Sequence, residues 1–520
     1  MTVSKAAVTQ NASATRGDRI RSAGAGFAAT LLGAGLGELV AALLQPSASP
    51  FAVIGGGLID LAPSWAKDTA IALFGTGDKA ALLVGIALVL AVVSGVAGML
   101  EWRRAGLGSV VLAALGVVAV VVAMTRADAG TYAWVPGIVA GGFAAVAVRV
   151  LVRLLRPVPD FSPTDDERRR FLLWTLGTAA AGAVALVVSN VARGASQSIE
   201  AVRNALRLPA AATPAAPVAA SAELGVPGLA PVVTPNIDFY RIDTALVIPR
   251  IDPAEWSLRI HGMVEREVVI SWDELLALPM QEADVTLACV SNEVGGSLIG
   301  NARWLGYPVR ELLKRAGVDA DADMVLSTSA DGFTASTPLE ALTDDRDSLF
   351  AVGMNGEPLP LAHGFPVRMV VPGLYGYVSA TKWVTELEVT RFDKEAAYWT
   401  TRGWSARGPI KLQSRIDVPR RGQTLSAGDT VIAGMAWQQQ VGIAGVEVRI
   451  DDGQWVAADL ATAISADTWV QWSVPWTAEP GTHTIECRAL SANGETQTSE
   501  PAAVAPDGAQ GWHRVELSVT

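Results

Sequence analysis

Five apolar blocks in residues 1–205 constrain this chain more than any other feature. They are about 18 to 22 residues long and lie near 24–44, 79–100, 107–124, 133–152 and 171–191. Because a helix needs about 20 apolar residues to cross a hydrocarbon core of about 30 Å, they predict an N-terminal α-helical bundle of about five transmembrane helices over residues 1–205. A further apolar stretch, 51–75, is interrupted by Asp60, Pro63, Lys67 and Asp68 and is predicted to be an interfacial or re-entrant segment.

The arginines between the blocks predict the orientation of the chain. Loops that stay in the cytoplasm carry an excess of Lys and Arg. With five spans every arginine cluster falls on one side, whereas the loop 125–134 holds one Arg and one Asp. We therefore expect a multi-pass protein of the cell membrane, with a cytoplasmic N-terminus and an extracytoplasmic chain after the fifth span. The clusters are Arg16, Arg19 and Arg21; Arg103 and Arg104; and Arg149, Arg153, Arg156, Arg168, Arg169 and Arg170.

The segment before the fifth block carries a second signal. It reads DERRRFLLWTLGTAAAGAVALVV, in which Arg168 and Arg169 precede Phe171 and Leu172. This pattern resembles a twin-arginine export signal, which would carry a folded domain across the membrane. The alternative is that the arginines only anchor a span at its cytoplasmic end.

Two polar features of the membrane half bear on its role. No histidine occurs before His261, and a b-type haem between helices usually needs histidine ligands, so no haem is predicted in this chain. Glu38 lies near the middle of the first block, where an ionised group is costly, and such residues often face a partner or a cavity.

After residue 205 the sequence reads as a linker followed by two soluble domains. Residues 206–235 are rich in Ala and Pro and predict a semi-extended tether. Short strand-like runs and helix signals then alternate over 236–400, including a capping box from Ser271 to Glu274, which predicts an α+β domain. Regular strands with tryptophans over 401–520, and a turn signal at Asp452 and Gly453, predict an all-β immunoglobulin-like sandwich.

Charge and cysteine content exclude some classes of function. The net charge is -11 and the sequence pI is about 5.0, and no basic stripe interleaved with aromatics appears, which excludes nucleic acid as a partner. Of the two cysteines, Cys487 alternates with Ile485 in a predicted strand and is interpreted as a core residue. Two distant cysteines provide no disulfide framework.

The other cysteine, Cys289, lies in the most informative stretch of the chain. That stretch, TLACVSNEVGGSLIGNARWLG, covers 286–306. A lone thiol after a strand is usually packing, but three more segments accompany it: PNIDFYRIDTAL (235–246), STSADGFTASTPL (327–339) and MNGEPLPLAHGFPVRMVVPGLYGYVSATKW (354–383). Together they resemble the sulfite oxidase family of molybdopterin enzymes, over residues 235–520.

The resemblance implies a cofactor and its ligands. It makes 236–400 a sulfite-oxidase-type molybdopterin-binding catalytic domain, with Cys289 as the thiolate ligand of molybdenum and the catalytic residue. A soft thiolate suits a metal whose other sulfurs come from the pterin dithiolene. The closing sandwich resembles the dimerisation domain of the family, so a homodimer is implied. The positions that match cofactor-binding residues are Asn236, Phe239, Tyr240, Thr328, His363, Arg368, Ala380, Thr381 and Lys382.

The segment after Cys289 departs from the family pattern and leaves the substrate open. Sulfite oxidases carry an arginine there, whereas this chain has Glu293, which would repel sulfite unless Arg303, Arg402 or Arg407 compensates. The hypothesis is a two-electron oxygen-atom transfer on sulfite or on a small-molecule or peptide sulfoxide, with a separate electron carrier as partner. The alternative is a catalytically degenerate scaffold that acts as a binding or assembly protein at the membrane.

Overall fold

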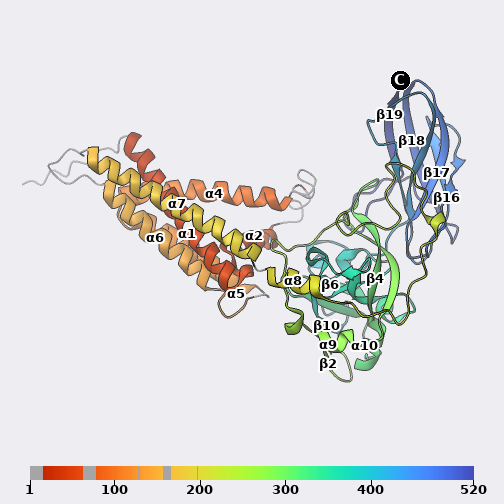
Figure 1. The fold of residues 1–520 in the computed structure, drawn as a ribbon, viewed down its shortest axis with the longest axis horizontal. Helices are drawn as coiled ribbons and strands as arrows, with labels where there is room; N and C mark the ends of the chain where they lie inside the picture. The colour runs from red at the N-terminus through yellow and green to blue at the C-terminus, as the bar shows by residue number, and fades with distance from the viewer. Residues whose placement is uncertain (1–15, 63–68, 70–77, 127–128, 156–164, 196) are drawn as a thin grey trace, which may run out of the picture. The chain divides into compact units, whose positions relative to one another are not determined.

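A computed structural model describes residues 16–62, 69, 78–126, 129–155, 165–195 and 197–520 (Figure 1). The chain divides into two compact units, each considered by itself. Unit 1 holds Met1–Gln197 and Ala245–Val247, and unit 2 holds Ser198–Thr244 and Ile248–Thr520. Of the residues that interrupt the stretch 51–75, Pro63, Lys67 and Asp68 lie outside the described residues.

Unit 1 is helical. Its helices are α1 (Arg16–Leu44), α2 (Pro50–Leu61), α4 (Asp78–Arg103), α5 (Leu107–Thr125), α6 (Val135–Leu155) and α7 (Asp165–Ala195). All but α2 are long and apolar enough to cross a membrane, and they cover the five predicted blocks. The helix α1 packs against α4, α6 and α7, and its glycines allow close contact. A Cβ built on Gly26 would lie 2.0 Å from the carbonyl oxygen of Ser94, so only glycine fits there.

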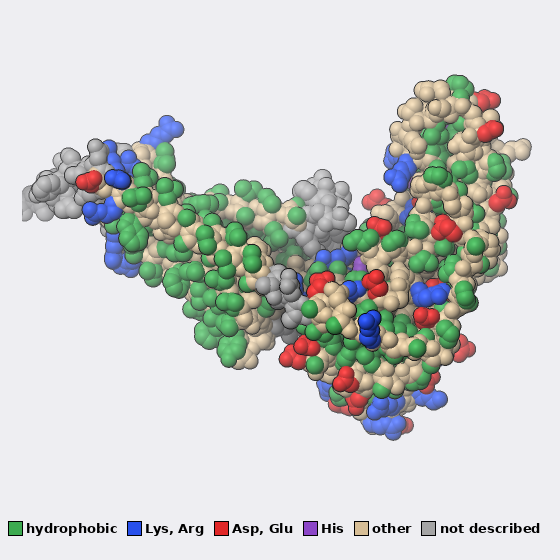
Figure 2. Space-filling view, in the orientation of Figure 1, with side chains coloured by type: hydrophobic (Ala, Val, Ile, Leu, Met, Phe, Trp, Pro, Cys, Tyr) green, Lys and Arg blue, Asp and Glu red, His purple; other side chains and the backbone are tan. Residues whose placement is uncertain are grey.

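The outer surface of this unit is apolar. Large hydrophobic side chains are exposed on several helices, among them Leu88 and Val92 of α4 and Leu176 of α7. Figure 2 shows hydrophobic side chains over most of the visible helical surface, with Lys and Arg gathered at one end. A soluble monomer rarely exposes so much contiguous apolar surface, whereas lipid accepts it.

The buried carboxylate of Glu38 has its hydrogen-bond partners at the start of the short helix α2. The Glu38 carboxylate, 2% exposed, accepts hydrogen bonds from the Ser49 hydroxyl at 2.8 Å and from the backbone amide of Phe51 at 3.1 Å. Ser49 is the N-cap of α2. A carboxylate at a helix N-terminus satisfies free amides and is favoured by the helix dipole, so Glu38 has a structural role inside the bundle.

The first part of unit 2 has two sheets. One has the strand order β2-β1-β10-β5-β6, and the other has the order β3-β4-β7-β8 with β9 paired to β7. The predicted capping box is present at α9, where Ser271 Oγ accepts from the amide of Glu274 and Glu274 Oε2 accepts from the amide of Ser271. The elements are α8 (Gln197–Ala205), β1 (Ser257–Gly262), β2 (Val268–Ser271), α9 (Trp272–Leu276), β3 (Gln281–Ala288), β4 (Ile299–Pro308), α10 (Val309–Ala316), β5 (Met324–Ser329), β6 (Thr334–Pro338), α11 (Glu340–Thr343), β7 (Leu349–Met354), β8 (Glu357–Pro358), β9 (Arg368–Val370) and β10 (Val384–Thr390).

The C-terminal part of unit 2 is the predicted immunoglobulin-like sandwich. Its sheets have the orders β11-β13-β17-β16 and β12-β19-β18-β14-β15. Cys487 is fully buried in the core between them, as predicted. The turn after β14 is present, but its left-handed residues are Asp451 and Asp452 instead of Asp452 and Gly453. The strands are β11 (Gln413–Val418), β12 (Thr424–Leu425), β13 (Gly428–Trp437), β14 (Ile443–Ile450), β15 (Val456–Ala457), β16 (Asp459–Leu460), β17 (Val470–Ala478), β18 (Gly481–Ser491) and β19 (His513–Val519).

The Ala/Pro-rich segment 206–235, predicted to be a semi-extended tether, packs on a folded part of the chain. It belongs to unit 2, where Leu208 and Val218 pack against the core and Thr213 forms a parallel bridge with Gln281 at the start of β3. Further along, the carbonyl of Ala230 accepts from the side-chain amide of Gln471 in the sandwich. Alanine and proline side chains give no periodic apolar pattern, so this packing could not be predicted from the sequence.

Candidate functional site

Cys289 lies directly after β3, in the connection to β4. The two strands are antiparallel and pair Ala288 with Ile299, which closes a loop over 289–298. The amide of Cys289 donates to the carbonyl of Leu298 at 2.9 Å, and the Asn292 side chain accepts from the amide of Leu298 at 2.8 Å. These two bonds close the base of the loop beside the thiol.

The thiol is buried and faces a basic environment. Cys289 is 8% exposed, and burial raises the pKa of its thiol, whereas hydrogen bonds from Ser291 and the positive charge of Lys382 act in the opposite direction. A metal that binds a cysteine takes up the thiolate and displaces the proton. A protonated thiol in the metal-free chain is therefore compatible with ligation.

Aromatic side chains form one wall of the site. The Phe239 ring stacks on Tyr240 with centroids 5.3 Å apart and makes edge contacts with Trp304 at 5.8 Å and with His363 at 5.6 Å. Burial and the charge at Cys289 raise the pKa of Tyr240, and Arg368 lowers it. These contacts bring the predicted pair Phe239 and Tyr240 to His363, Arg368 and Cys289.

His363 is a neutral member of this wall. Its pKa falls to about 3, because the ring is buried and lies near the positive charges of Arg368 and Lys382. The ring is hydrogen-bonded to the backbone of Asn236, whose side chain accepts from Asn355 at 2.8 Å and donates to the Met354 carbonyl at 3.2 Å. The backbone of Asn236 thus holds His363, and its side chain fixes its own loop.

Arg368 is a buried cation held by backbone oxygens. It is 4% exposed, and its guanidinium donates to the carbonyls of His363 at 3.2 Å, Met369 at 3.3 Å and Ala380 at 3.5 Å. The guanidinium also lies 5.0 Å from the Trp304 ring centroid. Among the residues that the structure describes, no carboxylate forms a salt bridge with Arg368. Burial lowers its pKa to about 10.

Lys382 shares one carboxylate with an arginine. Its ammonium lies 2.6 Å from Asp243 Oδ2 and donates to the Ala362 carbonyl at 3.1 Å. Asp243 also accepts from Arg241 at 2.9 Å. Burial lowers the pKa of Lys382 to about 8, although Asp243 opposes this shift. Asp243 is therefore shared by Arg241 and Lys382, and Arg368 adds a third positive charge near Lys382.

The remaining cofactor positions have different surroundings. Ala380 contributes its carbonyl to Arg368, and the Thr381 hydroxyl lies 2.7 Å from that of Ser327 on β5. Thr328, the next residue of β5, is half-buried and accepts from the Thr385 hydroxyl through its carbonyl at 3.4 Å. The segment 380–382 is therefore fixed to β5 through Ser327, a residue that sequence reasoning missed.

Three of the four expected substrate residues, Arg303, Arg402 and Arg407, have partners in the structure. Arg303 forms an ion pair with Asp284 at 2.7 Å, and this pair lies five residues along β3 from Cys289, a separation of roughly 16 Å in a strand. Arg402 lies over the Tyr398 ring at 3.6 Å, and Arg407 pairs with Glu340 at 3.5 Å on the surface. Glu293 is exposed. The prediction that Arg303 reaches in was wrong, since Asp284 holds its guanidinium.

Sequence reasoning also missed Arg241, Asp243 and Tyr375. The first two follow Tyr240 in the quoted run NIDFYRID, so their charges were a visible signal. Tyr375 precedes the turn 376–378; a Cβ on Gly376 would lie 3.8 Å from the Ala288 carbonyl and 4.0 Å from the Tyr240 hydroxyl. Burial and the charge at Cys289 raise the pKa of Tyr375 to about 12.

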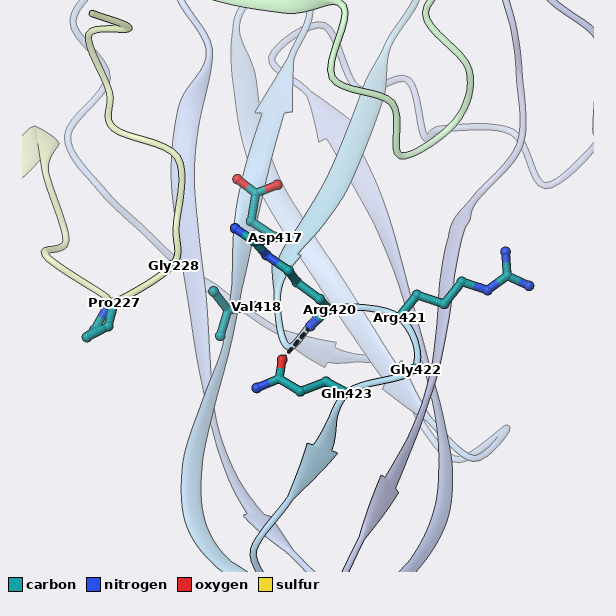
Figure 3. A pocket seen from close by; sticks show the side chains of 8 residues that line it. All are labelled: Pro227, Gly228, Asp417, Val418, Arg420, Arg421, Gly422 and Gln423. Atoms are coloured by element: carbon teal, nitrogen blue, oxygen red, sulfur yellow. Dashed lines mark hydrogen bonds between the residues drawn. The ribbon is translucent and has the colours of Figure 1, made fainter. Parts of the chain in front are cut away.

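A surface pocket in the sandwich is separate from this site. Its volume is about 440 Å³ (Figure 3). Its two arginines are exposed, and the Gln423 side chain accepts from the amide of Arg420 at 2.9 Å. It contains none of the residues predicted for the cofactor. The lining residues are Pro227, Gly228, Asp417, Val418, Arg420, Arg421, Gly422 and Gln423.

Comparison with known proteins identifies the family. Residues 245–399 match the oxidoreductase molybdopterin-binding domain, and residues 413–486 match a bacterial Ig domain. The oxidoreductase YuiH of Bacillus subtilis is 32% identical over 157 residues, which is 30% of this chain and 76% of that protein. The chain belongs to the sulfite oxidase family of molybdopterin oxidoreductases.

Eukaryotic members of the sulfite oxidase family are also similar. Mitochondrial sulfite oxidase of Mus musculus is 29% identical over 344 residues, and the match covers 55% of this chain and 62% of the mouse protein. The chain thus spans less than two thirds of that relative. The sulfane dehydrogenase SoxCD of Paracoccus pantotrophus matches with a TM-score of 0.48 and 23% identity, over 55% of this chain and 80% of that one.

The residues present fit the molybdopterin cofactor of this family. Arg368 is a buried cation with carbonyl partners, and a phosphate would supply the anion that a buried guanidinium requires. Cys289 offers a soft ligand, and Phe239 and Tyr240 give an apolar wall for a flat heterocycle. One site therefore offers a cation for the phosphate, a thiol for the metal and aromatic rings for the pterin.

Proposed function

We propose that this protein is a membrane-anchored, molybdopterin-dependent oxidoreductase that transfers an oxygen atom to or from an extracytoplasmic substrate. When bound, the molybdenum centre supplies the two-electron oxygen-atom transfer. The observation that carries the proposal is the buried Arg368, which lies with His363 and Lys382 in one site that also reaches Cys289. A buried cation without a carboxylate partner has a high free-energy cost unless an anionic ligand binds to it.

Each residue of the site has a role in the proposal. Cys289 ligates the metal through its sulfur, and Arg368 and Lys382 bind the phosphate of the pterin by charge-assisted hydrogen bonds. His363 stays neutral, because its pKa of about 3 lies below any working pH. It can therefore donate or accept a hydrogen bond to the pterin without adding charge.

The charges near Cys289 favour an uncharged substrate. Arg241 already shares Asp243 with Lys382, and Arg303 is tied to Asp284. The charges of Arg303 and Arg407 are already compensated by carboxylates, which disfavours a sulfite dianion, whereas an uncharged sulfoxide needs no arginine. We propose a sulfoxide-type substrate ahead of a sulfite-type one, with a separate one-electron carrier completing the cycle.

The helical unit supports the proposed location. Its five long apolar helices, exposed hydrophobic side chains and one-sided arginines favour a multi-pass anchor with a cytoplasmic N-terminus. A homodimer through the sandwich is part of the proposal. Light scattering in detergent, with the detergent mass subtracted, tests it, since a protein mass of one chain excludes the dimer.

Metal analysis of the full-length protein tests the cofactor. Protein made in cells that synthesise molybdopterin should carry about one molybdenum per chain, and Cys289→Ser should remove it. Cys487→Ser is the matched control, because Cys487 is buried in the sandwich and the Ser414 hydroxyl lies 3.3 Å from its sulfur. A folded, molybdenum-free parent would reject the enzyme and favour the degenerate scaffold.

Turnover of a substrate panel tests the reaction. A reduced dye should be oxidised in the presence of methyl sulfoxides, and an oxidised dye should be reduced slowly or not at all in the presence of sulfite. Rapid sulfite oxidation without sulfoxide reduction would overturn the preference for an uncharged substrate.

A further inference from the structure

The C-terminal sandwich contacts the chain on both sides of Cys289. Before Cys289, in β3, the hydroxyl of Thr286 accepts from the amide of Trp469 at 2.9 Å. The carbonyl of Thr286 accepts from the side-chain amide of Gln439 at 2.9 Å. The amide of Thr286 donates to the Asp467 carbonyl at 3.0 Å. Three bonds from the sandwich thus fix β3 three residues before the thiol.

The second contact fixes the loop after the thiol. Arg415 of β11 donates to the carbonyl of Gly296 at 2.8 Å. Its guanidinium is buried and held by Asp417 at 2.6 Å and 3.2 Å, so its direction is set. Asp417 in turn accepts from the amide of Ala230 at 3.1 Å. A buried arginine with a fixed carboxylate is a rigid donor for one loop carbonyl.

His513 of β19 completes this second contact. Its Nδ1 accepts from the amide of Ile416 at 2.9 Å, and its pKa falls to about 4, so the neutral ring carries its proton on Nε2. A Cβ built on Gly295 would lie 2.2 Å from that Nε2, and Gly295 has φ +76°. Only glycine therefore lets the loop lie this close to the ring.

We infer that Arg415 and His513 are positioning residues for the metal ligand, and that the sandwich fixes the Cys289 loop within its own chain. The inference rests on the proposed function for its catalytic meaning. The bonds within the loop join Cys289 and Asn292 to Leu298 and Gly296 to Glu293, so they do not tie Gly295 and Gly296 to the rest of the fold. A loop segment held only by local bonds opens at low cost. The sandwich supplies the missing restraint through Gly295 and Gly296, and through Thr286 in the preceding strand.

The test measures how fast iodoacetamide alkylates each cysteine in the full-length chain purified without cofactor. In Arg415→Met we expect the rate at Cys289 to rise at least about tenfold, because loop opening exposes the thiol. Cys487, in the sandwich core, reports whether the sandwich itself unfolds, and its rate should rise less than the rate at Cys289. Arg415→Lys, which keeps a cationic donor, should restore most of the protection at Cys289.

Arg449→Met is the matched control. Arg449 is also an ion-paired sandwich arginine, bound to Glu486, but it lies on β14, where it contacts Asp452, Trp455 and Trp512. It should change neither rate. An unchanged rate at Cys289 in a folded Arg415→Met protein overturns the inference.

A second variant covers the case in which Arg415→Met exposes Cys487 as well. Gly295→Ala acts from the loop side, since its new Cβ meets the His513 ring, and leaves the sandwich core intact. We expect the same tenfold rise at Cys289 alone, and an unchanged rate there overturns the inference. In the loaded enzyme, Arg415→Met should also shift the Mo(V) electron paramagnetic resonance signal at full molybdenum content. The alkylation test uses the cofactor-free chain, so its result is valid even if the parent binds no molybdenum. Failure of the proposed function can therefore be distinguished from failure of this inference.

Discussion

The guanidinium of Arg368 donates to the backbone carbonyl of His363 over 3.2 Å, so a buried cation is held at the main chain of a residue whose own imidazole is buried and neutral. Both side chains are less than 10% exposed. The neutral imidazole does not compensate the charge of the guanidinium, which is the reason we propose that this pair binds an anion.

Arg368→Met should separate stability from cofactor binding. We expect molybdenum content to fall more than about tenfold, because the phosphate loses its buried partner. The free energy of unfolding of the cofactor-free chain should not fall, and should rise by up to about 2 kcal/mol, because an uncompensated buried charge is removed. Urea unfolding and metal analysis measure the two effects.

Arg415→Met provides the contrast for this prediction. Arg415 is buried to a similar degree but pairs with Asp417, so its removal leaves a buried carboxylate and should cost about 3 to 5 kcal/mol. If Arg368→Met costs as much as Arg415→Met, Arg368 has a structural role and the anion-binding interpretation is wrong.

Lys382 should make cofactor binding depend on pH. Its pKa of about 8 is set first by burial; Asp243 opposes the shift, and Arg368 and Arg241 add to it. Above about pH 8 the ammonium loses its proton, so we expect molybdopterin affinity to fall about tenfold between pH 7 and pH 9.5. Reconstitution of the cofactor-free chain at the two pH values measures this change. Relative to the parent, Lys382→Arg should lack this fall, because an arginine keeps its charge.

The lowered pKa of Lys382 should affect the stability of the cofactor-free chain in the opposite direction, since stability should rise with pH where affinity falls. Between about pH 8 and pH 10.5 the unfolded chain holds the Lys382 proton and the folded chain does not. The unfolded state therefore binds more protons, and the contribution of Lys382 to the free energy of unfolding rises with pH over this window. The free energy of unfolding, measured in urea at pH 8 and pH 10, should change by different amounts in the parent and in Lys382→Arg. Equal changes between the two pH values would contradict the lowered pKa.

Phe239→Ala should destabilise unit 2 and open the site. Phe239 is 5% exposed and contacts Tyr240, Trp304 and His363, so its loss should cost about 3 to 5 kcal/mol. Phe333→Ala is the control, because Phe333 is half-buried and packs on Tyr398. It should cost less and leave molybdenum content unchanged. Equal losses in the two variants would show that the aromatic wall has no special role.

The twin-arginine prediction concerns transport. Arg168 and Arg169 are exposed at the start of α7, where an export machinery can reach them. Replacing both by lysine keeps the charge and should retain unit 2 in the cytoplasm, measured as loss of cleavage by protease added outside the cell. The pair Arg149→Lys and Arg153→Lys in α6 should have no effect. Unchanged cleavage in the Arg168 and Arg169 variant would leave these arginines as a simple membrane anchor.

Local patterns predicted the fold well where each signal was contained in a short segment. The apolar blocks marked the long helices, the Ser271 capping box marked α9, and alternation marked the strand that buries Cys487. The segment 206–235 gave no such pattern, so its packing in unit 2 was missed. Glu38 was expected to face a partner or cavity, whereas the structure pairs it with Ser49 of the α2 cap.

The sequence by itself predicted the helical half, the α+β and immunoglobulin-like parts and a set of candidate cofactor positions around Cys289, because apolar length, periodicity and contiguous motifs are local properties. Only the tertiary structure decided which charges meet. It gave Arg303 to Asp284, gathered Arg241 and Lys382 around Asp243, and brought Arg415 of the sandwich to the loop after Cys289. Such pairings join residues far apart in the chain and depend on strand register and burial, for which the linear order of residues carries no signal.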